Sequence, residues 1–307
     1  MATLRHVLDA RQFSREWLLK EFFPEARRME GLVGACVTNL HNRRTIIFFT
    51  EPSTRTFASF HMAASYLGVQ VPFSTESAAI SSSIAKGESL ADTIRVLNQY
   101  RPDVIILRCS QDGAPAEAAE FSRAAIINAG DGTNQHPTQA LLDVYTFWRK
   151  FGQVEGLAIA IVGDLARGRT VRSLCFLLAQ FPGVKIYFVA PESARVPQDV
   201  KEYLGSKGIL FEEGGDLGQV APLVDVVYQT RIQTERGSTI DPAAKQLLVV
   251  DKRVLGLMRE TAIVAHPLPR VDEITPDVDS DPRAVYLKEQ VFSGLVTRMA
   301  LLKMILS

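Results

Sequence analysis

Residues 46–68 read Ile-Ile-Phe-Phe-Thr-Glu-Pro-Ser-Thr-Arg-Thr-Phe-Ala-Ser-Phe-His-Met-Ala-Ala-Ser-Tyr-Leu-Gly. The apolar run 46–49 predicts a buried strand, and the spacing of apolar residues in 56–67 predicts a helix with Gly68 as its C-cap. The turn between them holds three hydroxyl groups and one guanidinium: Ser53, Thr54, Arg55 and Thr56. A strand that turns directly into a helix presents backbone N–H groups and the positive end of the helix dipole. The stretch therefore predicts a phosphate-binding turn, although an ordinary N-cap beside a solvated arginine fits these residues equally well.

The composition is that of an ordinary soluble globular protein. The 307 residues are 47% hydrophobic and 22% charged, and 34 basic residues balance 34 acidic ones. This length suits two domains of roughly 150 residues each. With no net charge, nothing favours nucleic acid or an anionic membrane as a partner, so any anion site must be local. We also expect no membrane span and no secretory signal, because long apolar runs are missing and the first eleven residues are largely polar.

The cysteines give an expectation about compartment and metal content. Cys36, Cys109 and Cys175 are far apart, odd in number and share no metal-ligand spacing. Such thiols are typical of free cysteines in a reducing compartment. We therefore expect a cytoplasmic protein that needs neither a metal ion nor another cofactor.

Short apolar runs alternate with helical patterns along the whole chain. The runs are 45–49, 69–73, 104–108 and 125–128 in the first half, and 157–162, 185–189, 224–228 and 263–265 in the second. They predict an α/β fold of two domains, each a mostly parallel sheet with helices on both faces. Helices are also expected over 139–151, where one could bridge the domains, and over 291–306. Because ligands of open α/β sheets bind outside the carboxyl ends of the strands, we expect the active site in the cleft between the two sheets.

Two further segments share the character of the first. Residues 128–139 read Asn-Ala-Gly-Asp-Gly-Thr-Asn-Gln-His-Pro-Thr-Gln, and residues 265–274 read Ala-His-Pro-Leu-Pro-Arg-Val-Asp-Glu-Ile. Together the three segments resemble the aspartate/ornithine carbamoyltransferase family, and within it the aspartate carbamoyltransferase catalytic chain. The resemblance runs from about residue 12 to residue 306 and includes 86–90, 163–171 and 230–233. Ordered motifs at family-like spacing along a whole chain are very specific.

This resemblance implies a reaction and a division of labour between domains. The carbamoyl group of carbamoyl phosphate would pass to the amino group of L-aspartate, giving N-carbamoyl-L-aspartate and phosphate in de novo pyrimidine biosynthesis. Residues 1–138 with a returning helix at 289–307 would form the carbamoyl phosphate-binding domain, and residues 150–288 the aspartate-binding domain. The substrate amine is then the nucleophile, and the chain has neither Gly-x-Ser-x-Gly nor a cysteine paired with a nearby histidine.

For carbamoyl phosphate, the resemblance implies a binding set of Ser53, Thr54, Arg55, Thr56, Arg108, His136, Gln139, Pro267 and Leu268. His136 would donate an N–H to the carbonyl oxygen, as an oxyanion-hole donor does. Gln139 would bond the carbamoyl NH₂, and backbone carbonyls at 267–268 would bind the carbamoyl and amino groups. A salt bridge at the rim is the alternative for Arg108, and a structural role is the alternative for His136. The implied catalytic set is Arg55, Thr56, Lys86, Arg108, His136 and Gln139.

For the acceptor, two guanidiniums and an amide suit a dicarboxylate, because arginine binds carboxylates bidentately. These are Arg169, Arg231 and Gln233, to which the resemblance adds Lys86. Ornithine-specific relatives carry Cys-Leu-Pro where this chain has residues 266–269. The resemblance also implies a homotrimer with shared active sites, in which Ser82 and Lys86 reach into the neighbouring protomer's site. A solvated surface lysine is the alternative.

Other positions are less specific. Glu51 and Arg236 would join the domains together with Arg169 or would simply be solvated, and Asp164 and Glu273 are expected to be structural. Five residues depart from the family pattern, which bears on kinetics rather than on the reaction: Phe57, His61, Cys109, Ser110 and Gln229. The sequence does not identify the proton acceptor, nor does it say whether a regulatory chain or a dihydroorotase partner binds.

Three other functions explain the sequence less well. A carbamoyltransferase for another amine leaves the paired Arg169 and Arg231 unexplained. A dinucleotide-binding oxidoreductase would need Gly-x-Gly-x-x-Gly after the strand that ends at Val162 and an acid after the next strand, and neither is present. An inactive homologue is not expected to keep every implied site residue: Arg55, Lys86, Arg108, His136, Arg169 and Arg231.

Overall fold

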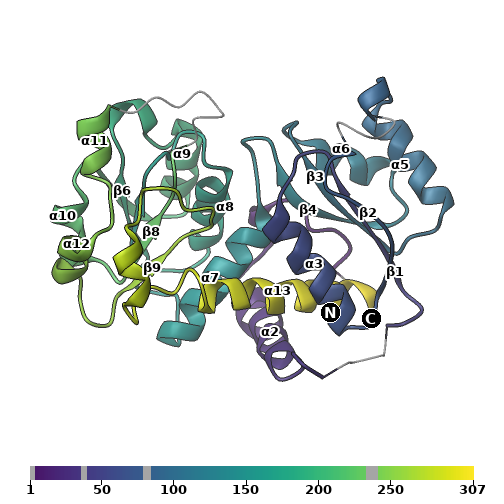
Figure 1. The fold of residues 1–307 in the computed structure, drawn as a ribbon, viewed down its shortest axis with the longest axis horizontal. Helices are drawn as coiled ribbons and strands as arrows, with labels where there is room; N and C mark the ends of the chain where they lie inside the picture. Colours follow the sequence, from purple (N-terminus) through teal and green to yellow (C-terminus); the bar gives the residue numbers. More distant parts are fainter. Residues whose placement is uncertain (1–3, 36–39, 79–83, 233–240) are drawn as a thin grey trace. The chain divides into compact units, whose positions relative to one another are not determined.

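The computed structural model describes residues 4–35, 40–78, 84–232 and 241–307. The chain divides into two compact units, Met1–Leu141 with Ser293–Ser307 (unit 1) and Leu142–Phe292 (unit 2). Each unit is built on one parallel β-sheet with helices packed around it (Figure 1). The predicted fold class, a two-domain α/β protein with parallel sheets, is confirmed.

The sheet of unit 1 has the strand order β2-β1-β3-β4. Its strands are β1 (Arg44–Phe49), β2 (Gln70–Thr75), β3 (Val104–Cys109) and β4 (Ala125–Asp131). Every residue of β3 and β4 is buried, which explains the apolar runs 104–107 and 125–127 with which these strands begin. Phe49 pairs with Arg108, and Cys109 pairs with Asp131. The carboxyl ends of β1, β3 and β4 therefore lie at one edge of the sheet.

The helices of unit 1 include α3 (Thr54–Tyr66), which begins directly after β1 and is followed by Gly68 at φ +71°. The positive φ of Gly68 agrees with the predicted helix end. The last part of α13 (Glu289–Leu306) also belongs to unit 1, where Arg298 Nη1 donates to Ser59 Oγ at 2.9 Å. The remaining elements before unit 2 are η1 (Ala10–Gln12), α1 (Arg15–Trp17), η2 (Leu18–Phe22), α2 (Phe23–Glu30), η3 (Ile84–Lys86), α5 (Leu90–Gln99), α6 (Ala114–Phe121) and α7 (Pro137–Phe151), whose residues after Leu141 belong to unit 2.

The sheet of unit 2 has the order β7-β6-β5-β8-β9. Its strands are β5 (Ala158–Val162), β6 (Lys185–Val189), β7 (Leu210–Gly214), β8 (Val226–Gln229) and β9 (Ile263–Ala265). The edge strand β7 is the one that the apolar runs did not predict, because its side chains are mostly exposed and include Glu212 and Glu213. The helices are α8 (Arg169–Leu178), η4 (Glu192–Ala194), α9 (Gln198–Ser206), α10 (Leu217–Val220), η5 (Ala221–Leu223), α11 (Pro242–Gln246), α12 (Lys252–Leu257) and η7 (Pro276–Ser280).

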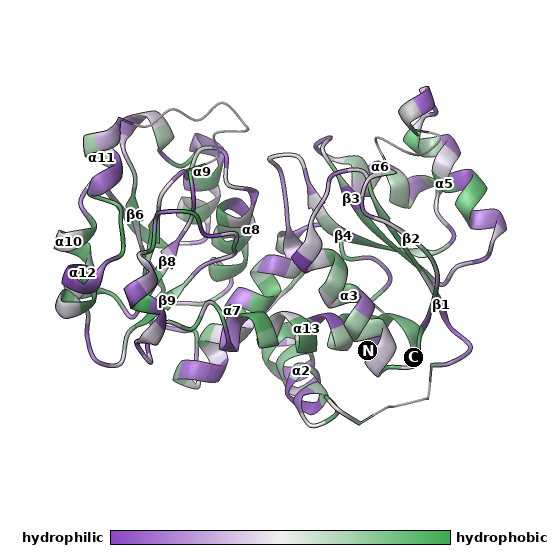
Figure 2. Cartoon of the chain, in the orientation of Figure 1, coloured by the Kyte–Doolittle hydropathy of each residue, from purple (hydrophilic) through white to green (hydrophobic). Residues whose placement is uncertain are grey.

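Hydropathy follows the layers within each unit. Figure 2 shows hydrophobic residues along the central strands, and helices that carry both hydrophobic and hydrophilic residues. This pattern is typical of helices that cover a sheet with one face and meet water with the other. No helix in the described ranges is long and apolar enough to cross a membrane.

Candidate active site

The turn between β1 and α3 places the predicted phosphate-binding hydroxyls at the start of a helix. The backbone carbonyl of Ser53 accepts the N–H of Phe57 at 2.9 Å, so the helix begins here. Ser53 makes no side-chain cap, because its Oγ instead donates to Thr56 Oγ1 at 3.1 Å. Thr54 Oγ1 donates to Glu76 Oε1 at 3.1 Å. This geometry leaves the capping role of the Ser53 side chain unused, as suits an anion site at a helix N-terminus.

Arg108 is the last residue but one of β3 and is only 7% exposed. Its Nη2 lies 2.7 Å from Glu51 Oε1, its Nε donates to the Glu51 carbonyl at 3.1 Å, and its Nη1 donates to the Ala129 carbonyl at 3.2 Å. A salt bridge, the alternative expected for Arg108, is therefore present. Its partner was not predicted, because Glu51 was assigned either to a contact across domains or to solvent. The signal for it was the position of Glu51 two residues beyond a strand that neighbours β3.

His136 and Gln139 are held by the loop that follows β4. The carboxylate of Asp131 shapes this loop by accepting N–H groups from Gly113 at 2.7 Å and Gln135 at 3.0 Å. The carbonyl of His136 accepts the N–H of Gln139 at 2.9 Å, which starts α7. Both side chains are nearly buried, at 5% and 8% exposure. Because β1, β3 and β4 are parallel, the turn 53–56, Arg108 and the His136 loop all follow strands at the same edge of the unit 1 sheet.

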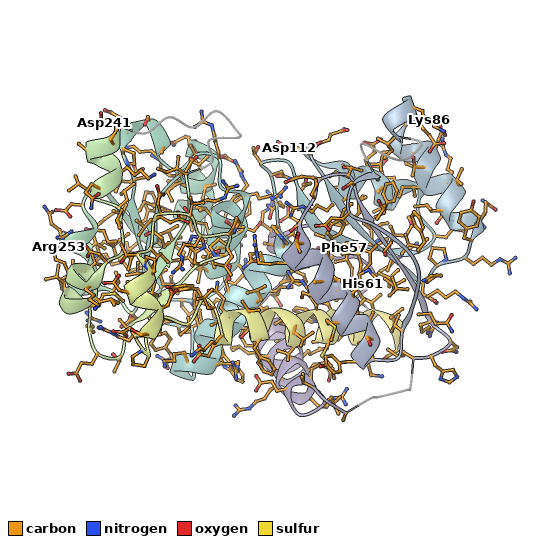
Figure 3. All side chains as sticks on the ribbon, in the orientation of Figure 1. Phe57, His61, Lys86, Asp112, Asp241 and Arg253 are labelled. Atoms are coloured by element: carbon orange, nitrogen blue, oxygen red, sulfur yellow. The ribbon has the colours of Figure 1, made fainter. Side chains whose placement is uncertain are left out.

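Two residues of α3 that depart from the family pattern, Phe57 and His61, are in ring contact with each other. Phe57 and His61 lie along α3 (Figure 3), with ring centroids 4.7 Å apart, and Phe57 also packs on Phe49. Burial lowers the pKa of His61, so the neutral ring is favoured at this position. Burial also raises the pKa of the Cys109 thiol to about 12. Cys109 is therefore a protonated thiol at neutral pH and a poor nucleophile.

In unit 2, the ends of β5 and β8 are in close contact. Gly163 follows β5 at φ +118°, and a Cβ atom there would lie 2.3 Å from the carbonyl oxygen of Thr230. Only glycine fits both constraints. Thr230 in turn donates its hydroxyl to the carbonyl of Val162 at 2.8 Å. Arg169, the first residue of α8, is 5% exposed, and Arg231 directly follows Thr230. Both arginines therefore follow strands at the carboxyl edge of the unit 2 sheet.

Pro267 and Leu268 follow β9, which is the neighbour of β8 on this edge. Leu268 has φ +56°, and the Leu268–Pro269 peptide is cis. Glu273 is buried and paired with His266, with Oε1 and Nε2 2.7 Å apart. Gln229, at the end of β8, is buried and donates its Nε2 to the Thr230 carbonyl at 3.3 Å.

Some predicted residues fall elsewhere. Lys86 ends η3 and is exposed, beside α5 in unit 1 (Figure 3). Ser82, Gln233, Arg236 and Cys36 lie outside the described residues. Within the described part of the chain, no group of three or more His, Cys, Asp or Glu side chains could hold a metal ion.

Family models match both halves of the chain. The carbamoyl-phosphate-binding domain of aspartate/ornithine carbamoyltransferases matches residues 5–149, and the aspartate/ornithine-binding domain matches residues 155–305. The chain belongs to the aspartate/ornithine carbamoyltransferase family. This confirms the resemblance found in the sequence.

Individual members of this carbamoyltransferase family are similar over almost the whole chain. The chloroplastic aspartate carbamoyltransferase of Arabidopsis thaliana is 50% identical over 99% of this chain and 78% of its own length. The aspartate carbamoyltransferase catalytic subunit of Methanocaldococcus jannaschii is 45% identical, over 98% and 97%. A crystal structure of Trypanosoma cruzi aspartate transcarbamoylase with carbamoyl phosphate and aspartate superposes with a TM-score of 0.89 at 39% identity, over 97% and 94%.

One expectation about this carbamoyltransferase is wrong. Composition and cysteine usage predicted a cytoplasmic protein, but several plant relatives at 48–50% identity are named as chloroplastic. The prediction failed because buried, unpaired thiols such as Cys109 and Cys175 indicate a reducing environment without identifying the compartment.

Proposed function

We propose that this chain is an aspartate carbamoyltransferase, which transfers the carbamoyl group of carbamoyl phosphate to the amino group of L-aspartate. The observation that carries the proposal is 50% identity with an aspartate carbamoyltransferase over 99% of the chain. The placement of Arg169 and Arg231 on one sheet edge supports aspartate over ornithine, because two guanidiniums suit a dicarboxylate.

Unit 1 supplies the carbamoyl phosphate site in this proposal. Arg55 and the hydroxyls of Ser53, Thr54 and Thr56 bind the phosphate at the start of α3. Arg108 contacts the phosphate and the carbonyl oxygen. His136 donates an N–H to the same oxygen, and Gln139 bonds the carbamoyl NH₂. These donors stabilise negative charge that develops on the carbonyl and on the departing phosphate.

Unit 2 supplies the aspartate site. Arg169, Arg231 and Gln233 bind the two carboxylates, and the backbone at Pro267 and Leu268 contacts the carbamoyl and amino groups. The amine nitrogen forms a bond to the carbonyl carbon, and the C–O bond to phosphate breaks with its electron pair leaving on phosphate. The amine also loses a proton, which the departing phosphate can accept. Holding the two substrates together supplies much of the acceleration, since effective molarities reach about 10⁵–10⁸ M.

We further propose a homotrimer in which Lys86 and Ser82 of one protomer complete the site of its neighbour. Lys86 is exposed and precedes α5. Lys86 lies between β2 and α5 in the sequence, and residues of both elements line a largely apolar cavity of about 480 Å³. Phe73, Val96 and Tyr100 in its lining are 46–68% exposed. Clustered exposed apolar side chains are typical of surfaces that other proteins cover.

The reaction itself is the first test. Purified protein is expected to release phosphate from carbamoyl phosphate only when L-aspartate is present, without added metal or nucleotide, because the proposed donors are all protein groups. Phosphate release would be measured with aspartate, with ornithine and without an amine, each with and without a chelator. Equal turnover with ornithine, or loss of turnover with chelator, would contradict the proposal.

Arg231→Ala is expected to impair aspartate use selectively. Removing one partner of a charge-assisted pair costs about 2 kcal/mol or more, so kcat/KM for aspartate should fall by at least about 30-fold. Carbamoyl phosphate affinity, measured by calorimetry, should change little. Arg195→Ala is the control, because Arg195 is an exposed arginine of the same unit. Loss of carbamoyl phosphate binding in Arg231→Ala would reverse the assignment of the two domains.

A further inference from the structure

The loop after β9 holds a leucine in a backbone conformation that leucine rarely adopts. Leu268 has φ +56°, in the left-handed region that is unfavourable for an L-residue because its Cβ crowds the following carbonyl oxygen. Such a residue persists only where its surroundings hold it. One such contact is the ring of His266, whose Nδ1 accepts the backbone N–H of Leu268 at 2.7 Å.

The two hydrogen bonds of the His266 ring fix its tautomer. Because Nδ1 accepts from Leu268, it carries no proton. Nε2 lies 2.7 Å from Glu273 Oε1, so Nε2 carries the proton and donates it. The other oxygen, Glu273 Oε2, accepts the backbone N–H groups of Val271 at 3.2 Å and Asp272 at 3.1 Å. Burial alone would raise the pKa of Glu273, but the His266 and backbone hydrogen bonds lower it below its ordinary value. The Glu273 carboxylate is therefore ionised, and each of its two oxygens accepts at least one hydrogen bond.

A chain of buried hydrogen bonds anchors this loop to two helices and to the neighbouring strand. The backbone N–H of His266 donates to Gln290 Oε1 at 2.9 Å. Gln290 Nε2 donates to Asp143 Oδ1 at 2.7 Å, and Tyr228 OH donates to Asp143 Oδ2 at 2.7 Å. Burial and then the charge of Asp143 raise the pKa of Tyr228, so its phenol keeps the proton that it donates. Tyr228 lies in β8, three residues before Arg231. Hydrogen bonds therefore connect the loop after β9 to β8, the strand that precedes Arg231.

We propose that His266 and Glu273 are positioning residues for the carbamoyl transfer. Glu273 holds the His266 ring in the Nε2–H tautomer, and the ring holds the Leu268 backbone in its left-handed conformation. This inference rests on the proposed function, in which the backbone of Leu268 contacts the reacting groups. His266 and Glu273 act through Leu268, and the hydrogen bonds of Asp143 hold the loop against β8, the strand that precedes Arg231.

Two substitutions at His266 separate this role from a merely structural one. Glutamine in His266→Gln can still donate to Glu273 but has no acceptor at the Nδ1 position. Asparagine in His266→Asn can accept the N–H of Leu268 but does not reach Glu273. We expect kcat to fall by about 10–100-fold in His266→Gln and much less in His266→Asn. Loss of a residue that orients a metal ligand through a hydrogen bond has an effect of this size. The melting temperature should fall more in His266→Asn, which leaves the buried carboxylate without its partner.

Activity and stability should therefore rank the two variants in opposite orders. If kcat follows the melting temperature in both variants, the role is structural and the proposal is overturned. Glu213→Gln is the control for removal of a paired carboxylate in unit 2, since Glu213 pairs with Lys201 at 2.8 Å, and it should leave both readouts unchanged.

A measurement without substrate tests the tautomer directly. In ¹⁵N spectra of histidine-labelled protein, with the signal assigned by its loss in His266→Asn, Nε2 should be protonated and Nδ1 should not. The opposite tautomer would overturn the proposal. If the unaltered protein releases no phosphate from carbamoyl phosphate and aspartate, the proposed function fails, and this spectrum still decides the tautomer.

Discussion

His136→Ala is expected to lower kcat for carbamoyl transfer by about 10²–10³, the usual effect of removing one oxyanion-hole donor. His136 is 5% exposed directly before α7, and its backbone is held there because its carbonyl accepts the N–H groups of Gln139 and Ala140. Alanine keeps that backbone arrangement and removes only the N–H donor. Because the donor acts mainly on charge that develops in the transition state, carbamoyl phosphate affinity should change less than kcat. Steady-state kinetics would measure kcat, and calorimetry on the same preparation would measure the affinity for carbamoyl phosphate.

Two variants make this result specific. His136→Asn keeps a side-chain N–H and should recover part of the lost rate. His41→Ala removes an exposed histidine of the same unit and should keep full activity. An unchanged kcat in His136→Ala would assign the ring to structure, and would leave Arg108 as the donor to the carbonyl oxygen.

Most strands could be predicted because parallel strands covered on both faces consist largely of apolar residues. Strands β3, β4 and β6 stand out in the sequence for this reason, and the glycine that follows α3 marks that helix end. Strand β7 could not be found in the same way, because it lies at a sheet edge where its side chains are mostly exposed. Exposure at an edge does not decide the outcome alone. The edge strand β2 is also largely exposed and was found from Val69, Val71 and Phe73, whereas Glu212 and Glu213 interrupt the apolar pattern of β7.

For the candidate site, the positions of several residues could be predicted from the sequence, but their side-chain partners could not. Ser53, Arg108 and His136 could be placed at one edge from sequence, since each follows a predicted parallel strand. Their partners could not be, because the contact of Arg108 with Glu51 joins side chains 57 residues apart. The sequence does carry a signal for Asp143, which stands alone among apolar residues in Leu141-Leu142-Asp143-Val144-Tyr145 and is fully buried in the structure. Lone acids in such positions are almost always paired, so they indicate a hydrogen-bond network even when the partners are unknown.

Mixed trimers of two inactive variants are expected to regain activity if active sites are shared between protomers. In the proposed trimer, Arg55→Ala would remove a phosphate ligand from a chain's own site, and Lys86→Ala would remove the cation that the chain supplies to its neighbour. Each variant alone should be nearly inactive, since every site in its trimer lacks one cation. In both variants the substituted residue is exposed in the described structure, so the fold should be preserved.

The amount of recovered activity follows from the symmetry of the ring. In the proposed cyclic trimer each site would combine the Arg55 of one chain with the Lys86 of the next. The variants are dissociated and reassembled at equal concentrations. A site is then intact when its Arg55 comes from a Lys86→Ala chain and its Lys86 comes from an Arg55→Ala chain. Random mixing produces this combination at about a quarter of all sites. Recovery near that fraction, with mixing verified by mass spectrometry of tagged chains, would support the shared site. If mixing is complete and activity stays at the level of the separate variants, Lys86 acts within its own chain or outside the chemistry.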